Sequence, residues 1–564
     1  MVEPGLTTRA AAAIARRIVR VGDAISASRM SPVDPRHLRP ATDLRVAVVC
    51  DEFTGLGLAP ECEATFLSPK IWRLQVQKTR PQLLFVESCW SGCAGQWRGL
   101  VTGGGEVVTR LVRFCRHAGI PTVFWAKEDP VHLDDFLATA KLFDWVFTTD
   151  AGSISRYRRE LRHDRLGVMT FPVQPRLHNP LSSSPRERAS FFAGAWYGNF
   201  PRRCAEFSEL AEGLMDAGPF HVYRRPGPPE IGDYPDRFAD ALYPAVDYAR
   251  IGDIYRRYSI GLSINTVTDS PTMFARRAVE MLACGTTVYS NPCRALGEFF
   301  PGLVEQFSRR ERIAEKARRE YSEPASMSRR LTRALGVRAA VGRHSWSARL
   351  AMLIGRIAGR DELRQPEVAM VARVADAGEM ARLAAFLESQ RGVCGEAVAW
   401  VADGVEPCRG VRRLTADQLS APLSELLGGD TLLGYWSPMD WYGPHYLLDL
   451  CLAAGSYAGN AVGKGAYYHW DGAALEQQGT EAEYTHCGPI PLRRSLARAR
   501  VWPGNSTLQS IGLAEQGGHA TDAYVSIDAF SYAQGGSGAS MPAFMAAEYP
   551  STRADVCPSN WSKA

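Results

Sequence analysis

The sequence has no apolar run approaching the roughly 18 residues that a membrane-spanning helix needs. The chain also has no large excess of charge of one sign, because 65 basic and 60 acidic residues leave a formal net charge of +5. That excess is too small to indicate a nucleic-acid-binding protein, so we expect no nucleic acid among the partners. The Gly-x-Gly-x-x-Gly loop of a dehydrogenase does not follow the first expected strand, where only Gly55 and Gly57 occur. We also expect no secretion signal at the N-terminus.

The chain contains 13 cysteines, but they do not have the spacing of a metal-binding site. The pairs Cys50/Cys62 and Cys89/Cys93 have no neighbouring His or Cys at the spacing of a zinc site. An odd number of cysteines scattered over a large chain is typical of reduced, buried thiols. We therefore expect a cytoplasmic protein with no metal and no other cofactor.

The first 43 residues read as a basic helix followed by a linker. Residues 7–28 are rich in alanine and include Arg9, Arg16, Arg17 and Arg20, and residues 31–40 contain three prolines. Such a helix is typically a solvated surface helix. The alternative is a helix that lies on an anionic membrane surface, which would place the protein at the inner face of the membrane as a peripheral contact.

Beyond residue 43, short apolar runs alternate with helical patterns. At roughly 100–200 residues per domain, 564 residues suggest three or four domains. The alternation predicts two Rossmann-like α/β domains with parallel sheets, at 44–180 and 181–360, and a ligand in the cleft between them. A third α/β unit is expected over 361–564, where periodic segments become few after residue 428.

The stretch from Asn265 to Gly285 is the most informative candidate for ligand binding. It follows an expected strand and opens a helix at about Thr272, whose free backbone N–H groups suit a diphosphate. Arg276 and Arg277 can add charge-assisted hydrogen bonds, and a carboxylate at Glu280 can accept bonds from ribose hydroxyls. The alternative is that Arg276 and Glu280 form an ordinary i,i+4 surface pair.

A second candidate group lies in the first domain, just past the carboxyl end of a strand. Glu128, Asp129 and His132 are placed where an acid or base acting on an acceptor would sit. The alternative is a helix start, because Asp129-Pro130 favours a turn and Asp134 and Asp135 favour the first turn of a helix. Asp150 is expected to cap the next helix.

Residues 44–305 resemble bacterial glycosyltransferases related to spore-maturation (CgeB-like) proteins. The resemblance rests on Phe124-Trp-Ala-Lys-Glu-Asp-Pro130, Phe143-Asp-Trp-Val-Phe-Thr-Thr-Asp150, Gln174-Pro175 with His178-Asn-Pro180, Phe192-Ala-Gly194, Ser270-Pro-Thr-Met-Phe-Ala-Arg-Arg277, Glu280-Met-Leu-Ala-Cys-Gly285 and Ser290-Asn291. It implies a GT-B fold whose second domain holds a nucleoside-diphosphate-sugar. Leaving-group charge would then be stabilised by cationic side chains rather than by a metal.

The same resemblance implies individual roles. Glu280 is similar to the ribose-binding carboxylate that ends an E-x7-E pattern, whose first position here is Thr272. Arg203 resembles a diphosphate-contacting arginine. Asn265 and Ser270 are expected to face the cleft and bond to phosphate or sugar.

The third unit resembles GT-A-like regions appended to some of these family members. The resemblance rests on Trp441-Tyr-Gly-Pro-His-Tyr-Leu447, Asp449-Leu450, Val462-Gly-Lys464, Tyr467-Tyr468 and Arg493-Arg494. Where relatives carry an acidic metal-binding run, only Asp440 remains, so the unit is interpreted as a degenerate transferase domain. The sequence thus predicts a glycosyltransferase, specifically a hexosyltransferase, acting on a glycan, lipid-linked or protein acceptor that serves as a cell-envelope precursor. The alternative is a non-catalytic glycan-binding scaffold.

Overall fold

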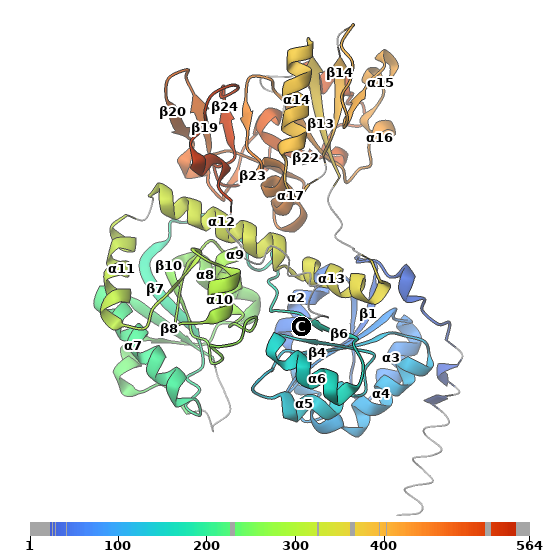
Figure 1. Ribbon diagram of the computed structural model, residues 1–564, viewed down its shortest axis with the longest axis vertical. Helices are drawn as coiled ribbons and strands as arrows, with labels where there is room; N and C mark the ends of the chain where they lie inside the picture. The colour runs from blue at the N-terminus through green and yellow to red at the C-terminus, as the bar shows by residue number, and fades with distance from the viewer. Residues whose placement is uncertain are drawn as a thin grey trace, which may run out of the picture.

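The protein contains three α/β units, each built on its own large sheet (Figure 1). The computed structural model describes residues 23–548 except 25, 29, 41, 226–231, 324–325, 361–366, 394, 402 and 514–519. The predicted helix at residues 7–28 lies mostly outside the described residues, as does the end of the chain from residue 549. None of the described helices is long and apolar enough to cross a membrane.

The first sheet has six parallel strands in the order β2-β1-β3-β4-β5-β6. Its central strands consist of apolar residues buried on both faces, as expected for a parallel sheet covered by helices. The elements are β1 (Arg45–Val49), α2 (Glu52–Leu58), β2 (Glu63–Phe66), α3 (Trp72–Thr79), β3 (Leu83–Glu87), α4 (Glu106–His117), β4 (Thr122–Ala126), α5 (Leu133–Ala140), β5 (Trp145–Thr148), α6 (Ile154–Leu161) and β6 (Leu166–Val168). The strand order reverses between β1 and β3, where such sheets bind ligands.

The second sheet is also six-stranded and parallel, in the order β12-β11-β10-β7-β8-β9. The elements are β7 (Glu187–Gly194), α7 (Pro201–Ala217), β8 (Phe220–Arg224), β9 (Leu242–Tyr243), α8 (Ile251–Arg257), β10 (Tyr258–Ser263), α9 (Arg277–Ala283), β11 (Thr287–Ser290), α10 (Arg294–Phe299), β12 (Val304–Gln306) and α11 (Arg310–Ser322). This is the doubly wound Rossmann order, which reverses between β7 and β10. The predicted tandem Rossmann-like architecture is therefore confirmed.

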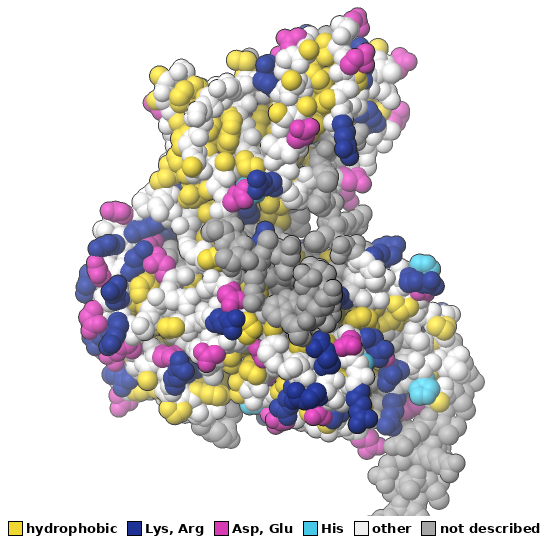
Figure 2. Space-filling model, in the orientation of Figure 1, with side chains coloured by type: hydrophobic (Ala, Val, Ile, Leu, Met, Phe, Trp, Pro, Cys, Tyr) yellow, Lys and Arg dark blue, Asp and Glu magenta, His cyan; other side chains and the backbone are white. Residues whose placement is uncertain are grey.

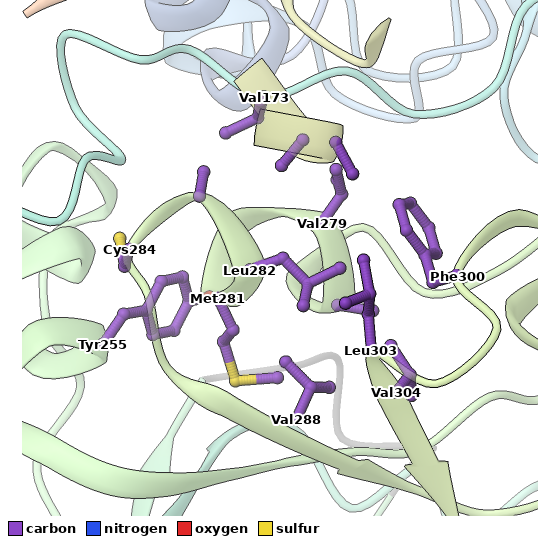
Figure 3. Close-up of a cluster of buried hydrophobic side chains, with 14 of the residues drawn as sticks. Val173, Tyr255, Val279, Met281, Leu282, Cys284, Val288, Phe300, Leu303 and Val304 are labelled. Atoms are coloured by element: carbon purple, nitrogen blue, oxygen red, sulfur yellow. The ribbon is translucent and has the colours of Figure 1, made fainter. Parts of the chain in front are cut away.

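Helix α9 is fixed on the second sheet by close packing. Met281 and Leu282 point toward Val288 and Leu303 in the core (Figure 3). At Gly261 on β10, a Cβ atom would lie 2.1 Å from the Met281 sulfur, so only glycine admits this approach. The packing sets the position of Arg277 and Glu280 on the same helix.

Two helices at the end of the second unit connect all three units (Figure 1). Helix α12 (Met327–Arg343) lies under the third unit, and α13 (Trp346–Ala358) packs on the first sheet. The Trp346 ring lies 5.7 Å from Trp125 and 6.5 Å from Phe85. A Cβ at Gly57 would come within 2.0 Å of the Trp346 Nε1 atom. Helix α13 lies within residues 181–360, which the sequence assigns to the second domain. Its apolar face nevertheless packs on the first domain.

The third unit has an eight-stranded mixed sheet, β15-β14-β13-β16-β22-β18-β23-β21, and a four-stranded sheet, β17-β24-β19-β20. The elements are β13 (Val368–Val374), α14 (Ala377–Ser389), β14 (Gly395–Val401), β15 (Val411–Arg413), α15 (Ala416–Ser420), α16 (Leu423–Leu426), β16 (Leu432–Trp436), β17 (Trp441–Tyr442), α17 (Tyr446–Ser456), β18 (Ala461–Gly463), β19 (Tyr467–Trp470), β20 (Leu475–Gln478), β21 (His486–Cys487), β22 (Ser495–Arg498), α18 (Leu508–Leu513), β23 (Tyr524–Ser526) and β24 (Tyr532–Gln534). Most strands after β16 span two to four residues, too few to give a periodic sequence signal.

Candidate functional site

Hydrogen bonds join the first two domains at the carboxyl edges of their sheets. The Ser270 hydroxyl donates to the Asp150 carboxylate at 2.6 Å, and the Thr272 hydroxyl donates to the Thr149 carbonyl at 2.8 Å. The Ala151 N–H donates in return to Thr272 Oγ1 at 2.8 Å. Both hydroxyls that the sequence assigned to the donor are thus engaged by the first domain. Asp150 caps the short helix that follows it, as predicted.

The loop before α9 is longer than predicted. We expected the helix to open at about Thr272, but it begins at Arg277 because Ser270 and Thr272 face the first domain. Asn265 holds the loop from within: its side chain accepts from the Ala275 N–H at 2.7 Å and donates to the Ser290 hydroxyl at 2.9 Å. It is 2% exposed, so in this state it supports the loop rather than lining an open surface.

Three arginines gather around Tyr197 at the switch point of the second sheet. Arg203 lies with its Cζ 4.8 Å from the Tyr197 ring centroid, and Arg225 donates to the Tyr197 hydroxyl. The Arg277 guanidinium lies 4.5 Å from the Phe192 ring, and its Nη1 is buried without a hydrogen-bond partner. Within the described part of the chain, none of the three has a carboxylate within ion-pair distance.

Electrostatics in this arginine cluster favour an anion. Burial and the charge of Arg277 lower the pKa of Arg203 to about 10. Burial also lowers the pKa of Arg277, and the Arg225 charge adds to that effect. The outer flank of the second domain differs, since basic and acidic side chains alternate there (Figure 2). An anion in the cluster would remove the mutual repulsion and satisfy the free guanidinium N–H.

Sequence reasoning found Arg203 and Arg277 but missed Arg225. Arg225 could have been identified from its position directly after a strand of the second sheet, at the edge where ligands bind. Arg203 belongs to the first turn of α7, so that helix N-terminus faces the same region.

Glu280 is buried and fully engaged. Its carboxylate accepts from the Tyr248 hydroxyl at 2.5 Å and the Tyr255 hydroxyl at 3.1 Å, and Oε1 lies 3.1 Å from Arg276 Nε. Burial alone would raise its pKa, but the charges of His178 and Arg276 and the two hydroxyls hold the pKa below its ordinary value. The i,i+4 pair with Arg276 exists, yet Glu280 is 2% exposed, so this is no surface pair.

Phe53 of the first domain reaches across to this pair. Its ring centroid lies 4.4 Å from Arg276 Cζ, 5.5 Å from Arg225 Cζ and 4.7 Å from the Tyr248 ring. The ring therefore connects the Glu280 network to the arginine cluster through cation–π contacts.

A polar cluster that the sequence analysis missed lies at the switch point of the first sheet. The buried Lys127 ammonium contacts Asp51 Oδ2 at 2.7 Å and Glu87 Oε1 at 3.0 Å. Burial raises the pKa of Glu87, whereas the carboxylates raise that of Lys127 despite burial. Each residue ends or follows a different strand, a pattern that could have revealed the cluster.

The structure does not bring Glu128, Asp129 and His132 together as one acid–base group. Glu128 is partly exposed, with Oε1 3.8 Å from Lys127 Nζ. Asp129 is 1% exposed and accepts from Thr148 and Tyr157, and burial raises its pKa to about 7. His132 is exposed and pairs with Asp135 at 2.9 Å.

In the third unit, Asp440 is enclosed by protein partners. It accepts from the Tyr532 hydroxyl at 2.7 Å and the Gly535 N–H at 2.9 Å, and Arg493 lies 3.8 Å away. Asp449 forms a buried ion pair with Arg338 of α12, at 2.7 and 2.8 Å. Over the residues that the structure covers, no group of three or more His, Cys, Asp or Glu side chains is arranged to hold a metal ion.

A family model described as "Glycosyl transferase-like" matches residues 203–355, which include Arg203, Arg225, Arg277 and Glu280. Among solved structures, a glycosyltransferase from Rickettsia africae ESF-5 is 11% identical with a TM-score of 0.36, over 51% of this chain and 80% of that one. AviGT4, a glycosyltransferase involved in avilamycin A biosynthesis, is 16% identical with a TM-score of 0.35, over 56% and 98%. Anabaena Alr3699/HepE in complex with UDP-glucose is 11% identical with a TM-score of 0.35, over 53% and 85%. No curated protein matches the sequence.

Replacing Glu280 tests the buried network. Glu280→Ala leaves the buried Arg276 charge unpaired, so we expect the free energy of unfolding to fall by about 3–5 kcal/mol. Glu298→Ala is the matched control, because Glu298 forms an i,i+4 pair with the exposed Arg294, where about 0–1 kcal/mol is expected. Chemical denaturation of both variants measures the difference. Equal losses would show that Glu280 makes no special contribution to folding.

Asp129 makes stability depend on pH. Its folded-state pKa of about 7 exceeds the unfolded value, so the folded state holds an extra proton and loses stability as pH rises from about 4 to 7. Asp129→Asn cannot titrate. As the pH rises from 5 to 8, we expect the free energy of unfolding of the variant to increase by about 2–3 kcal/mol relative to that of the unchanged protein.

Denaturation curves at the two pH values measure this change. The exposed Asp134→Asn variant controls for loss of a carboxylate. Parallel pH dependence in Asp129→Asn and the unchanged protein would contradict a raised Asp129 pKa.

Proposed function

We propose that the protein is a glycosyltransferase that moves a sugar from a nucleoside-diphosphate-sugar to an acceptor hydroxyl. The observation that carries the proposal is the cluster of Arg203, Arg225 and Arg277 at the switch point of a Rossmann-type sheet, where no carboxylate of the described residues lies within ion-pair distance. The match to a glycosyltransferase-like family over 203–355 covers all three arginines and supports the same conclusion.

In this proposal, the arginines stabilise the diphosphate as negative charge develops on the departing group. The α7 N-terminus faces the same charge, so the chain supplies cations from its own side chains and backbone rather than from a bound metal. Two of the guanidinium groups are already oriented before the nucleotide-sugar binds, because Tyr197 holds Arg225 and Phe192 holds the buried Arg277.

Glu280 remains the proposed ribose contact, with a condition set by the structure. Glu280 is 2% exposed and lies behind Tyr248 and Tyr255, which donate to its two oxygens, so a ribose reaches the carboxylate only by displacing a tyrosine hydroxyl. The proposed donor-side residues also include Asn265, Ser270 and Thr272. The Ser270 and Thr272 hydroxyls must first release their hydrogen bonds to the first domain. Donor binding is thus coupled to separation of the domains at these contacts.

The acceptor is proposed to bind on the first domain, where the Glu128 and His132 side chains are accessible and Asp129 is buried. A hexose as the transferred sugar, a cell-envelope or surface-glycan precursor as the acceptor, and a cytoplasmic site of action at the inner face of the membrane are parts of the same proposal. The likeness to spore-maturation relatives motivates them.

The third unit is proposed as a degenerate GT-A-like accessory domain. Its main sheet reverses order between β13 and β16, so a ligand would be expected near Asp440. Tyr532, Gly535 and Arg493 already engage that carboxylate. The saturation of Asp440 and Glu280 also favours the second candidate function, a glycan-binding scaffold without turnover.

Nucleotide binding tests the arginine cluster. Arg277→Gln should weaken the affinity for a nucleoside diphosphate about 10- to 100-fold, in line with about 1.5–3 kcal/mol for a hydrogen bond to a charged group. Arg202→Gln is the matched control, because Arg202 is exposed and pairs with Glu206 outside the cluster. Calorimetry with UDP, GDP and dTDP measures both. Unchanged affinity in Arg277→Gln would remove the diphosphate from this cluster.

Donor hydrolysis separates the enzyme from the scaffold. We expect slow release of nucleoside diphosphate from UDP-, GDP- or dTDP-sugars by the full chain, and we expect it to persist in excess EDTA because cationic side chains stabilise the leaving group. Binding without release would favour the scaffold. Loss on chelation with rescue by Mn²⁺ would contradict metal-independent chemistry.

A further inference from the structure

Three cysteines lie at the carboxyl edge of the first sheet, beside the polar cluster of Lys127, Asp51 and Glu87. Cys50 follows β1, and Cys89 and Cys93 belong to the loop after β3. The proposed transfer reaction uses none of them. Because they lie within a few residues of Asp51 and Glu87, a chemical change there would act directly on this edge of the cleft.

Cys50 and Cys93 are held next to one another by the backbone. The Cys93 N–H donates to the Cys50 carbonyl at 2.7 Å, and the Gly92 N–H donates to Asp51 Oδ1 at 2.8 Å. Both side chains pack against the same apolar cluster, together with Trp125 and Trp346. The Cys89 side chain packs in the cluster on the other face of the sheet, so Cys89 is separated from this pair.

The two thiols differ in exposure and acidity. Cys93 is partly exposed, and a hydrogen bond with the Cys50 thiol lowers its pKa. Cys50 is buried, and the same hydrogen bond, together with burial, raises its pKa well above the ordinary value. An accessible thiol of lowered pKa beside a buried partner is the arrangement found in redox-sensing cysteines.

We propose that Cys50 and Cys93 form a peroxide-sensitive dithiol, in which Cys93 is the attacking and Cys50 the resolving cysteine. The Cys93 thiolate attacks hydrogen peroxide, giving a sulfenic acid and hydroxide. The Cys50 sulfur then attacks the Cys93 sulfur, forming the disulfide and releasing water, which carries the sulfenic oxygen and the Cys50 proton. A dithiol reductant returns the pair to the reduced state: it supplies two electrons and two protons to the disulfide and is itself oxidised to a disulfide.

The disulfide would tie the loop after β3 covalently to the end of β1. The backbone hydrogen bond from Cys93 to Cys50 and the bond from the Gly92 N–H to the Asp51 carboxylate already join these segments, so closure requires little movement of the main chain. The bond would fix the loop that carries Trp90, whose exposed ring packs edge-on against His132 at 4.9 Å. The redox state of the dithiol therefore sets the freedom of the acceptor-side loop.

The test treats the reduced full-length protein with hydrogen peroxide, alkylates the remaining thiols under denaturing conditions and maps the peptides by mass. We expect a peptide pair linked through Cys50 and Cys93, two daltons lighter than the reduced pair, and its loss on reduction. Cys50→Ser should leave a sulfenic acid at Cys93 that dimedone traps. Cys115→Ser is the control, since Cys115 is buried on the opposite face.

Two results would overturn the proposal. One is a link between Cys89 and Cys93. The other is full alkylation of Cys50 and Cys93 at peroxide levels that already oxidise methionine. The mapping is done on the unchanged protein, so it does not depend on a variant that folds poorly.

Discussion

The arrangement of the first two domains depends on one helix that crosses between them. Helix α13 follows the second domain in sequence, yet its Trp346 packs between Phe85 and Trp125 of the first sheet and closes over Gly57. Helix α12, directly before it, packs on α9 of the second domain, so the two consecutive helices hold the first two domains together. The contacts from Ser270 and Thr272 to the first domain, and the reach of Phe53 to Arg276, follow from that placement.

Between those edges, charge is distributed unevenly. The first domain contributes a cluster with more carboxylates than cations around Lys127, and the second contributes arginines with no carboxylate nearby in the described chain. Phe53 lies between them and contacts Arg225 of this cluster as well as Arg276, which pairs with Glu280. A phosphorylated ligand would be attracted to one wall and repelled by the other, so the charge pattern orients it with its phosphates toward the second domain.

Much of this fold was predictable from the sequence. Buried apolar runs such as Leu83–Glu87 identify parallel strands because they need no polar face, and the alternation with helices gives two doubly wound domains. The placement of α13 was not predictable, since its amphipathic pattern suits either sheet. The late strands escaped detection because segments such as Trp441–Tyr442 are too short to show a period.

The candidate site was predictable only in part. The position of Arg277 near the start of the expected helix indicated its role, and the family resemblance pointed to Arg203 and Glu280. What the sequence could not reveal is how side chains are used: the Ser270 and Thr272 hydroxyls bond to another domain, and Tyr248 and Tyr255 come from a segment with no motif of its own. Contacts between residues distant in sequence decide such roles, and local spacing does not encode them.

The ion pair between Arg338 and Asp449 has a consequence for how this chain can change over evolutionary time. It is buried, and around it Ala334 of α12 packs against Tyr468 and Phe530 of the third unit. A chain cut after residue 360 would expose this apolar surface and leave the Arg338 guanidinium without its counter-charge. Loss of the third unit would therefore lower the solubility of the remaining chain, whether or not that unit carries chemistry of its own.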